Sequence, residues 1–371
     1  MRKVAVFFGG ESCENEISVL TGVFVLNVLS TEKFDILPVF LAEDGGMFTS
    51  PKMKEIATFK KYTKSDFKRI IFEDGQAFVL SKGKLKSLGK IDVALNCCHG
   101  GWGEGGGLSA MMAWNGIAFA SPDWTSSGVF MDKCATKLIA RALNVPTVEY
   151  IRVNECDYQK RGAFLLKTID ARLKYPVVVK PAHLGSSIGI SVAKNEEEAK
   201  TAIESAFMLD DRVIIERYLE NKRDVNCAAY SLNGEIFVSE PELAFGEGVY
   251  SFEEKYIKRR MDGGKSAKGG GRYAFKGELR EKIRAYTKTL YKRMDLQGVV
   301  RMDFLVADGK AYLCEVNTVP GSLAYYLFCE RITDARDFFG ALVEDAYRRG
   351  CAEKKARVRT GILQEVEWRR K

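Results

Sequence analysis

Apolar and polar residues along the first third of the chain recur in an order that predicts strands separated by helices. The apolar run Lys3–Phe8 ends at two glycines, which is typical of a buried parallel strand. The next segment, Glu16–Ser30, carries its apolar residues at helical spacing. Further strands are predicted at 34–41, 91–98 and 117–120, and a further helix at 108–114. This alternation predicts an open parallel sheet covered by helices, which is an α/β unit.

Beyond residue 125 the predicted strands and helices follow one another less regularly, in two further units of comparable size. We interpret the lysine-rich stretch 51–90 of the first unit as irregular surface structure, and the glycines and cations of 258–272 as a mobile loop. The predicted helices of the later units are 131–143, 196–208, 278–294 and 335–348, and the predicted strands are 147–153, 175–180, 188–193, 213–217, 224–232, 235–239, 299–306 and 311–316.

Length and composition limit the classes of protein to consider. A chain of 371 residues with 46% hydrophobic residues has enough apolar side chain for about two or three cored domains, which excludes a mainly disordered protein. The net charge of +8 suits a cleft for phosphates or carboxylates and is too dilute to predict nucleic-acid binding. Nine cysteines without a C-x-x-C pair argue against a disulfide framework or a zinc site. We expect a soluble, cytoplasmic protein without a membrane span.

Four polar residues near the C-terminus predict a cation site. Alternation along the strand puts Arg301 and Asp303 on one face, and Glu315 and Asn317 share a face of the next strand. A hairpin turn at Asp308-Gly309 would bring the four side chains together. Carboxylate and amide oxygens suit Mg²⁺, which commonly bridges substrate phosphates. A surface hairpin with ordinary charges explains the same pattern equally well.

Two segments of the middle unit have features of a nucleotide site. The strand that ends at Lys180 enters a turn of small residues up to Gly189, which is able to wrap phosphates with backbone amides. The turn lacks the ending of a Walker loop, so it does not predict a P-loop fold. The strand at Glu216–Leu219, followed by Asp224, resembles an adenine-binding hinge. Taken alone, each segment is explained better by ordinary structure, a Gly-Ser hairpin for the first and a strand that runs into a loop for the second.

A glycine-rich stretch offers a competing interpretation as a dinucleotide site. Gly101, Gly103 and Gly106 match G-x-G-x-x-G between a predicted strand and helix, and Asp123 lies at the distance of a ribose-binding acid. The first turn of the chain, after Phe8, lacks this fingerprint. A nicotinamide enzyme is therefore the weaker interpretation.

Together the motifs resemble those of ATP-grasp carboxylate–amine ligases, and specifically the D-alanine–D-alanine ligase family. The resemblance covers residues 3 to about 321. Each block is short, but their order and spacing make the set specific. The blocks are Phe8–Ser12 with Asn15–Ser18, His99–Gly105, Met131–Lys133 with Lys137, Lys180–Gly189, Glu216–Leu219, Glu254–Tyr256, Arg301–Asp303 and Glu315–Gly321.

The resemblance implies an N-terminal open parallel α/β domain (1–125) followed by a two-lobed α+β ATP-grasp fold. Its lobes would be a central lid domain (126–218) and a C-terminal domain (219–371) that carries the metal site and an omega-type loop at 258–272. ATP would bind between these two lobes. Relatives are usually homodimers, so a homodimer is expected here too. We predict no function for the basic tail 357–371.

The resemblance also implies a role for individual residues. The implied nucleotide-binding residues are Lys133, Lys180, Ser187 and Lys255 for phosphates, Glu216, Tyr218 and Leu219 for adenine, and Asp224 for ribose. Two Mg²⁺ ions, or Mn²⁺ in their place, are implied at Asp303, Glu315 and Asn317. The implied residues around the amino-acid substrates are Glu16, hydrogen-bonded with Ser186 and Tyr256, together with His99, Arg301 and Gly321.

The activity implied is ATP-dependent joining of two D-alanines through an acyl phosphate, for peptidoglycan precursor synthesis. Tyr326 stands near the position where the family commonly has a small hydroxyl residue beside the second substrate. Other acceptors, such as D-serine, D-lactate or another amino acid, therefore stay open. A nucleotide-binding protein without ligase activity is the less favoured alternative, because the implied site residues Lys180, Arg301 and Asp303 are all present.

Overall fold

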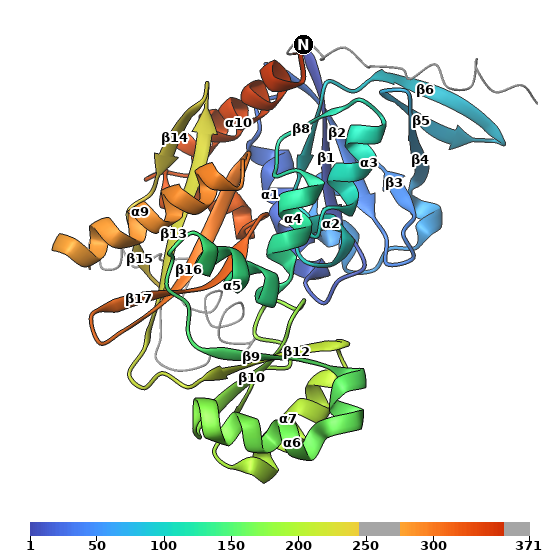
Figure 1. Cartoon of the computed structure of the whole chain (residues 1–371). Helices are drawn as coiled ribbons and strands as arrows, with labels where there is room; N and C mark the ends of the chain where they lie inside the picture. Colours follow the sequence, from blue (N-terminus) through green and yellow to red (C-terminus); the bar gives the residue numbers. More distant parts are fainter. Residues whose placement is uncertain (245–274, 352–371) are drawn as a thin grey trace, which may run out of the picture.

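A computed structural model describes residues 1–244 and 275–351, which form three β-sheets flanked by helices (Figure 1). The predicted mobile loop 258–272, the tail 357–371, and the candidate site residues Lys255 and Tyr256 lie outside the described residues. Within the described ranges, no helix has the length and apolarity needed to cross a membrane.

The N-terminal sheet is built around the predicted parallel strands. β1 (Arg2–Gly9) lies between β2 (Phe34–Leu41) and β7 (Val93–Asn96), and β8 (Ala118–Phe119) extends the parallel part. Helices α1 (Asn15–Val28) and α3 (Gly107–Trp114) occur close to their predicted positions. The α/β prediction for this unit is confirmed.

The interpretation of 51–90 as irregular is wrong, because the sheet continues through it. The turns Asp74-Gly75 and Lys82-Gly83 have positive φ, the backbone that two-residue hairpins need. Lysines occupy the exposed positions of these strands and mask the period-two apolar pattern. The added antiparallel strands are β3 (Met47–Thr49), β4 (Lys68–Glu73), β5 (Gln76–Ser81) and β6 (Lys84–Lys90), and the segment before them forms the short 3₁₀ helices η1 (Pro51–Lys54), η2 (Ile56–Phe59) and η3 (Lys64–Asp66).

The central unit is a four-stranded antiparallel sheet in the order β11-β10-β12-β9. Its strands are β9 (Tyr150–Asn154), β10 (Val177–Pro181), β11 (Ser191–Ala193) and β12 (Arg212–Arg217). Helices α6 (Glu155–Leu173) and α7 (Glu196–Phe207) pack on one face of it. The sequence patterns did not predict α6, because its first half is polar and a non-helical residue, Arg161, interrupts it.

The C-terminal sheet has the order β14-β13-β16-β17, with β15 (Glu242–Leu243) added on β13. Helix α9 (Gly277–Arg293) packs on this sheet, as do α4 (Trp124–Met131) and α5 (Lys133–Ala142), through Phe130 and Ala140. The strands are β13 (Arg223–Leu232), β14 (Glu235–Val238), β16 (Val299–Ala307) and β17 (Lys310–Asn317).

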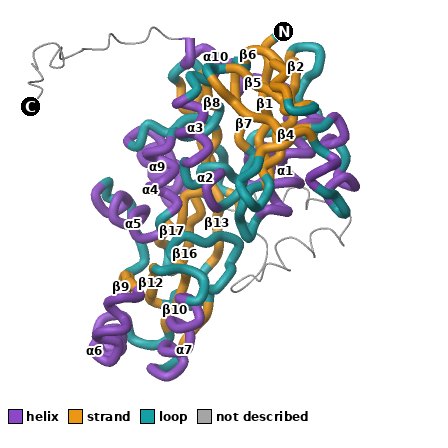
Figure 2. Tube along the Cα trace, turned by 90° about the vertical axis from the view of Figure 1, so that its right-hand side faces the viewer, coloured by secondary structure: helices purple, strands orange, loops and turns teal. Residues whose placement is uncertain are grey.

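One hydrophobic core joins the N-terminal and C-terminal sheets. Phe8 of β1 and Phe339 of α10 (Asp334–Cys351) belong to the same buried cluster, as does Leu323 of the 3₁₀ segment η5 (Gly321–Leu327). The β9–β12 sheet and its helices form a separate lobe with a core of its own, at the far end of the molecule from the N-terminus (Figures 1 and 2). The joint between this lobe and the rest of the molecule is where the candidate residues gather.

Candidate functional site

The predicted hairpin of β16 and β17 is present and brings its polar residues together. Asp308 and Gly309 form the turn with φ of 50° and 72°, and the register pairs Arg301 with Asn317 and Asp303 with Glu315. The Arg301 guanidinium donates two hydrogen bonds to the Asp303 carboxylate, at 2.7 and 2.9 Å. Asn317 Nδ2 donates to Asp303 Oδ2 at 3.1 Å. The hairpin and its register are therefore as predicted.

The donor set of the hairpin fits a magnesium ion. Asp303 and Glu315 lie opposite each other on neighbouring strands, and their side chains are 20% and 26% exposed, so a cation can reach both. Carboxylate and amide oxygens are the ligands that Mg²⁺ prefers. Cationic side chains already lie beside both carboxylates: Arg301 binds Asp303, and Lys133 Nζ lies 3.6 Å from Glu315 Oε2.

Glu216 is held between two lysines at the joint between the lobes. Its Oε2 lies 2.7 Å from Lys180 Nζ and its Oε1 lies 2.8 Å from Lys137 Nζ, and all three side chains are buried. Burial alone would raise the pKa of Glu216, but the charges of Lys137 and Lys180 lower it to about 2. Burial would likewise lower the pKa of Lys180, but the interactions with Cys314 and with the Glu216 carboxylate raise it instead. The Glu216 carboxylate is therefore ionised, and both of its oxygens face lysines.

The loop after Lys180 reaches the N-terminal unit through Ser186. The Ser186 hydroxyl donates to Glu14 Oε1, and Lys133 Nζ donates to the carbonyl of Leu184. The predicted contact between Ser186 and Glu16 is wrong. Glu14 is the cap residue of α1, whereas Glu16 is two residues further on, about 200° around the helix, and is exposed to solvent.

A helical-face argument would have found the correct glutamate. Glu14, Ser18 and Thr21 follow the i, i+4, i+7 spacing of one face of α1, and this polar stripe points at the site. Ser18 bonds the backbone of Cys97, and Thr21 bonds His99. The signal was present in the sequence, but the motif alone did not distinguish the two glutamates.

His99 is buried and hydrogen-bonded at both ring nitrogens. Nδ1 lies 2.7 Å from the carbonyl of Val319 and therefore donates to it, which leaves Nε2 to accept from the Thr21 hydroxyl at 2.8 Å. Burial lowers the pKa of His99 to about 4, so the ring is neutral. Nearby, Glu104 accepts from the amides of Gly100 and Val319. Burial, with a contribution from the charge of Glu14, raises its pKa to about 7.

The remaining predicted residues occupy the edges of this region. Asp224 pairs with Lys222 at 2.7 Å, and Leu219 follows the end of β12. The Tyr218 amide donates to the carbonyl of Pro176 at 3.3 Å, so this N–H is already used within the lobe. Gly321 begins η5, where Ser322, Leu323 and Ala324 all have positive φ between 46° and 51°. Such strained backbone in residues other than glycine is found most often at functional sites.

The glycine-rich stretch serves packing rather than a dinucleotide. A Cβ at Gly103 would lie 2.3 Å from Cys98 Cβ, and one at Gly107 would lie 2.4 Å from the Trp102 ring. Asp123, the candidate ribose acid, caps α4 by accepting from the Ser126 amide at 2.9 Å. These close approaches require glycine whether or not a ligand binds.

A cavity of about 800 Å³ lies beside the contact between Glu14 and Ser186. Its wall combines the first turn of the chain, Glu11–Glu14, with Gly100–Trp102 and the loop residues His183–Gly185. The cavity is thus formed between the N-terminal unit and the central lobe, and Glu14 supplies a carboxylate to its wall.

The arrangement of the two lobes defines the class of protein. Lysines of α5 and β10 face an acidic hairpin of a second antiparallel sheet, which is the layout of an ATP-dependent carboxylate–amine ligase with the ATP-grasp fold. Two family models match the chain, the "D-ala D-ala ligase N-terminus" over residues 3–122 and the "D-ala D-ala ligase C-terminus" over residues 139–345. The chain belongs to the D-alanine–D-alanine ligase family.

Individual relatives agree over nearly the whole length. A "D-alanine--D-alanine ligase" of Thermosipho melanesiensis is 32% identical over 333 residues, which is 88% of this chain and 89% of the relative. The crystal structure of the Helicobacter pylori enzyme, 27% identical, matches with a TM-score of 0.73 over 94% of this chain and 98% of its own. The Bacillus anthracis ligase complexed with ATP matches with a TM-score of 0.63 and 22% identity over 94% and 99%, which shows the fold alone.

Proposed function

We propose that this protein uses ATP to join two D-alanines into D-alanyl-D-alanine for the bacterial cell wall. Membership in the family supports the reaction. The observation that carries the proposal is the hairpin of Arg301, Asp303, Glu315 and Asn317 facing Lys133 and Lys180. Cations and oxygen ligands converge there from both lobes, as transfer of a phosphoryl group requires.

The first step in this proposal makes an acyl phosphate from the carboxylate of one D-alanine. The carboxylate oxygen attacks the terminal phosphorus of ATP, and ADP leaves. Lys133 and Lys180, with Ser187 of the loop, hold the phosphates, and Arg301 offsets the negative charge that gathers on the oxygens. When bound at Asp303, Glu315 and Asn317, two Mg²⁺ ions would add Lewis-acid neutralisation of the phosphate oxygens.

The second step joins the two amino acids. The amine of the second D-alanine attacks the acyl carbon, a tetrahedral intermediate forms, and phosphate leaves with the proton that the amine nitrogen loses. In this proposal Arg301 and the Gly321 amide stabilise the oxygen of that intermediate. Neutral His99 lies by the carboxyl group of the first substrate, and Glu14, bonded to Ser186, pairs with its ammonium group. Tyr256 would complete this hydrogen-bonded set.

The adenine end of ATP needs a revised proposal. Glu216 faces Lys137 and Lys180 with both oxygens, so we assign it to orienting these lysines as well as to the adenine amine. Leu219 offers its backbone to the adenine edge, beside Tyr218, Asp224 takes the ribose, and Lys255 takes a phosphate. We also propose that the domains divide at residues 125 and 218, that the protein forms a homodimer, and that it is located in the cytoplasm.

The second substrate is the point at which the alternatives differ. The hydroxyl of Tyr326 lies 3.3 Å from Arg301 Nη1, so a phenol occupies the neighbourhood of the reacting oxygens. Purified protein with ATP, Mg²⁺ and D-alanine should release phosphate and form D-alanyl-D-alanine. Competition with D-serine, D-lactate and L-amino acids tests the acceptor, and a preferred product other than the D-alanine dimer would overturn the proposal. Phosphate release that does not rise with D-alanine would favour a protein that only binds nucleotide.

A further inference from the structure

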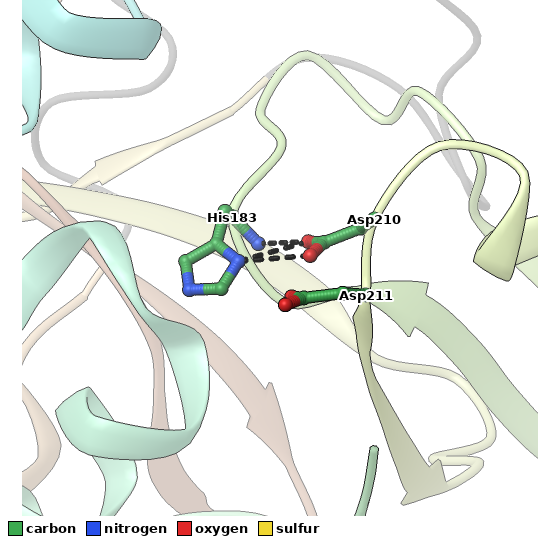
Figure 3. A group of neighbouring side chains, drawn as sticks. All are labelled: His183, Asp210 and Asp211. Atoms are coloured by element: carbon green, nitrogen blue, oxygen red, sulfur yellow. Dashed lines mark hydrogen bonds and ion pairs between the residues drawn. The ribbon is translucent and has the colours of Figure 1, made fainter. Parts of the chain in front are cut away.

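His183 lies at the joint between the central lobe and α5, within a cluster of charged groups that the proposed reaction does not use. Its backbone amide donates to Asp210 Oδ2 at 2.7 Å, and its Nδ1 lies 2.9 Å from Asp210 Oδ1. Figure 3 shows the ring facing Asp210, with Asp211 beside it. This side chain is two-thirds buried and has carboxylate partners on both sides.

The other side of the ring faces α5. Nε2 lies 3.7 Å from Asp132 Oδ2 and 3.4 Å from Arg212 Nη1, and Arg212 also bonds Asp132. Asp132 caps α5 by accepting from the amides of Cys134 and Ala135, and it directly precedes Lys133. Since α5 packs on the C-terminal sheet, the cluster connects the two lobes between which ATP would bind.

We propose that His183 is a positioning residue, an ionic latch that holds the loop 181–189 against α5 so that Ser186 reaches Glu14 and the Leu184 carbonyl reaches Lys133. The loop follows Lys180 directly, so its position also sets the place of the phosphate-binding residues. The proposal rests on the proposed function for its kinetic test only, since the loop contacts exist without substrate.

The charge balance explains why the latch works with a protonated ring. Asp132 and Asp210 face His183 with two negative charges, and Arg212 supplies one positive charge. Contacts with Asp132 and Asp210 raise the pKa of His183 to about 9, against burial, which lowers it. Asp211 of the same turn is exposed. The other charged groups of α5 and β9 are Lys133, Lys137 and Arg141 on α5 and Arg152 on β9. A metal ion is disfavoured at His183, Asp210 and Asp211, because the Nδ1 proton fills the contact with Asp210.

The sign of the pH dependence follows from the raised pKa. The latch is complete below the ordinary pKa of histidine, about 6.5, and is lost as the pH rises through about 9. We therefore expect the KM for ATP of the wild-type protein to rise as the pH passes 9. His183→Arg keeps the charge and should not show this rise. His183→Gln should have a KM for ATP that is raised about tenfold already at pH 7.5, as expected for a lost charged hydrogen bond.

Hydrogen exchange of the loop amides separates the latch from the reaction. In the protein without substrates, His183→Gln and Asp210→Asn should each exchange the amides of 184–188 about tenfold faster, with His183→Arg close to the wild type. Glu149→Gln, which removes ion pairs with Arg172 and Arg217 inside the same lobe, is the matched control and should change neither readout. Amide exchange that is unchanged in both His183→Gln and Asp210→Asn would overturn the latch. So would a KM for ATP that depends on pH equally in His183→Arg and in the wild type. Absence of ligation with D-alanine, in contrast, would overturn only the proposed function.

Discussion

The Ser186 hydroxyl donates a hydrogen bond to the carboxylate of Glu14, a residue 172 positions earlier in the chain. Ser186 has a φ of 52°, so the loop backbone is strained where this contact forms. The contact connects the central lobe to the first turn of the N-terminal unit, on the wall of the cavity. The contact also distinguishes Glu14 from Glu16, which the sequence motif alone did not.

Glu14→Gln should reduce kcat/KM for D-alanine by at least about a hundredfold, because it removes the charge that would pair with the substrate ammonium. Glu16→Gln is the matched control, since its exposed side chain lies off the polar face of α1, and it should keep wild-type rates. Steady-state kinetics with varied D-alanine measure both. A loss in Glu16→Gln with normal rates in Glu14→Gln would reverse the assignment.

Glu315→Gln should abolish turnover while the fold stays intact. The change keeps the shape of the side chain but removes one of the two carboxylates at the proposed metal site, which raises the barrier to phosphoryl transfer. Phosphate release measures turnover, and thermal unfolding checks the fold. Glu344→Gln on α10, which loses only a pair with Arg2, serves as the control. Turnover in Glu315→Gln at the wild-type rate would rule out this metal site.

Removing one lysine from the buried group around Glu216 should destabilise the protein strongly. Lys137→Met leaves Glu216 buried with Lys180 as its remaining lysine, which should cost about 3–5 kcal/mol in the free energy of unfolding. The double variant Lys137→Met with Glu216→Gln should not recover that loss, because Lys180 is then buried without its carboxylate partner. Urea unfolding measures both variants and the single Glu216→Gln variant. If the losses of the two single variants simply add in the double variant, Lys137 and Glu216 are not coupled.

Because the ring of His99 is buried in its neutral form, the free energy of unfolding should depend on pH in the acidic range. Its pKa is about 4 in the folded protein and about 6.5 in an unfolded chain, so between these values the unfolded state binds more protons. Stability therefore falls as the pH drops from about 6.5 to 4, by on the order of 2–3 kcal/mol from this group. Glu104, with its raised pKa, has the opposite sign, since its contribution is lost as the pH rises through about 7.

The measurement for His99 compares the wild type with His99→Asn, so that the contribution of Glu104 is present in both. Urea unfolding at pH 7 and pH 4.5 should show the stability gap between them shrinking at the lower pH. A gap that stays constant would mean that His99 does not titrate between these values.

Prediction from sequence succeeded where local pattern decides structure. The Asp308-Gly309 turn and the alternation around Arg301 are local features, and the hairpin formed as expected. It failed where polar residues hide the pattern, as in α6 and in the lysine-rich hairpins of β4 to β6. In both segments, the buried residues are too few, or too often separated by polar residues, to reveal the pattern before the packing is known.

The sequence by itself determined the family, the order of the parallel strands in the first unit, and the hairpin that gathers Asp303 and Glu315. Only the tertiary structure decided that Ser186 meets Glu14, that Lys137 shares Glu216 with Lys180, and that His183 joins α5 to the central lobe. The reason is physical. Alternation and turn geometry act within a few residues, whereas these contacts join distant segments whose approach depends on how the lobes pack.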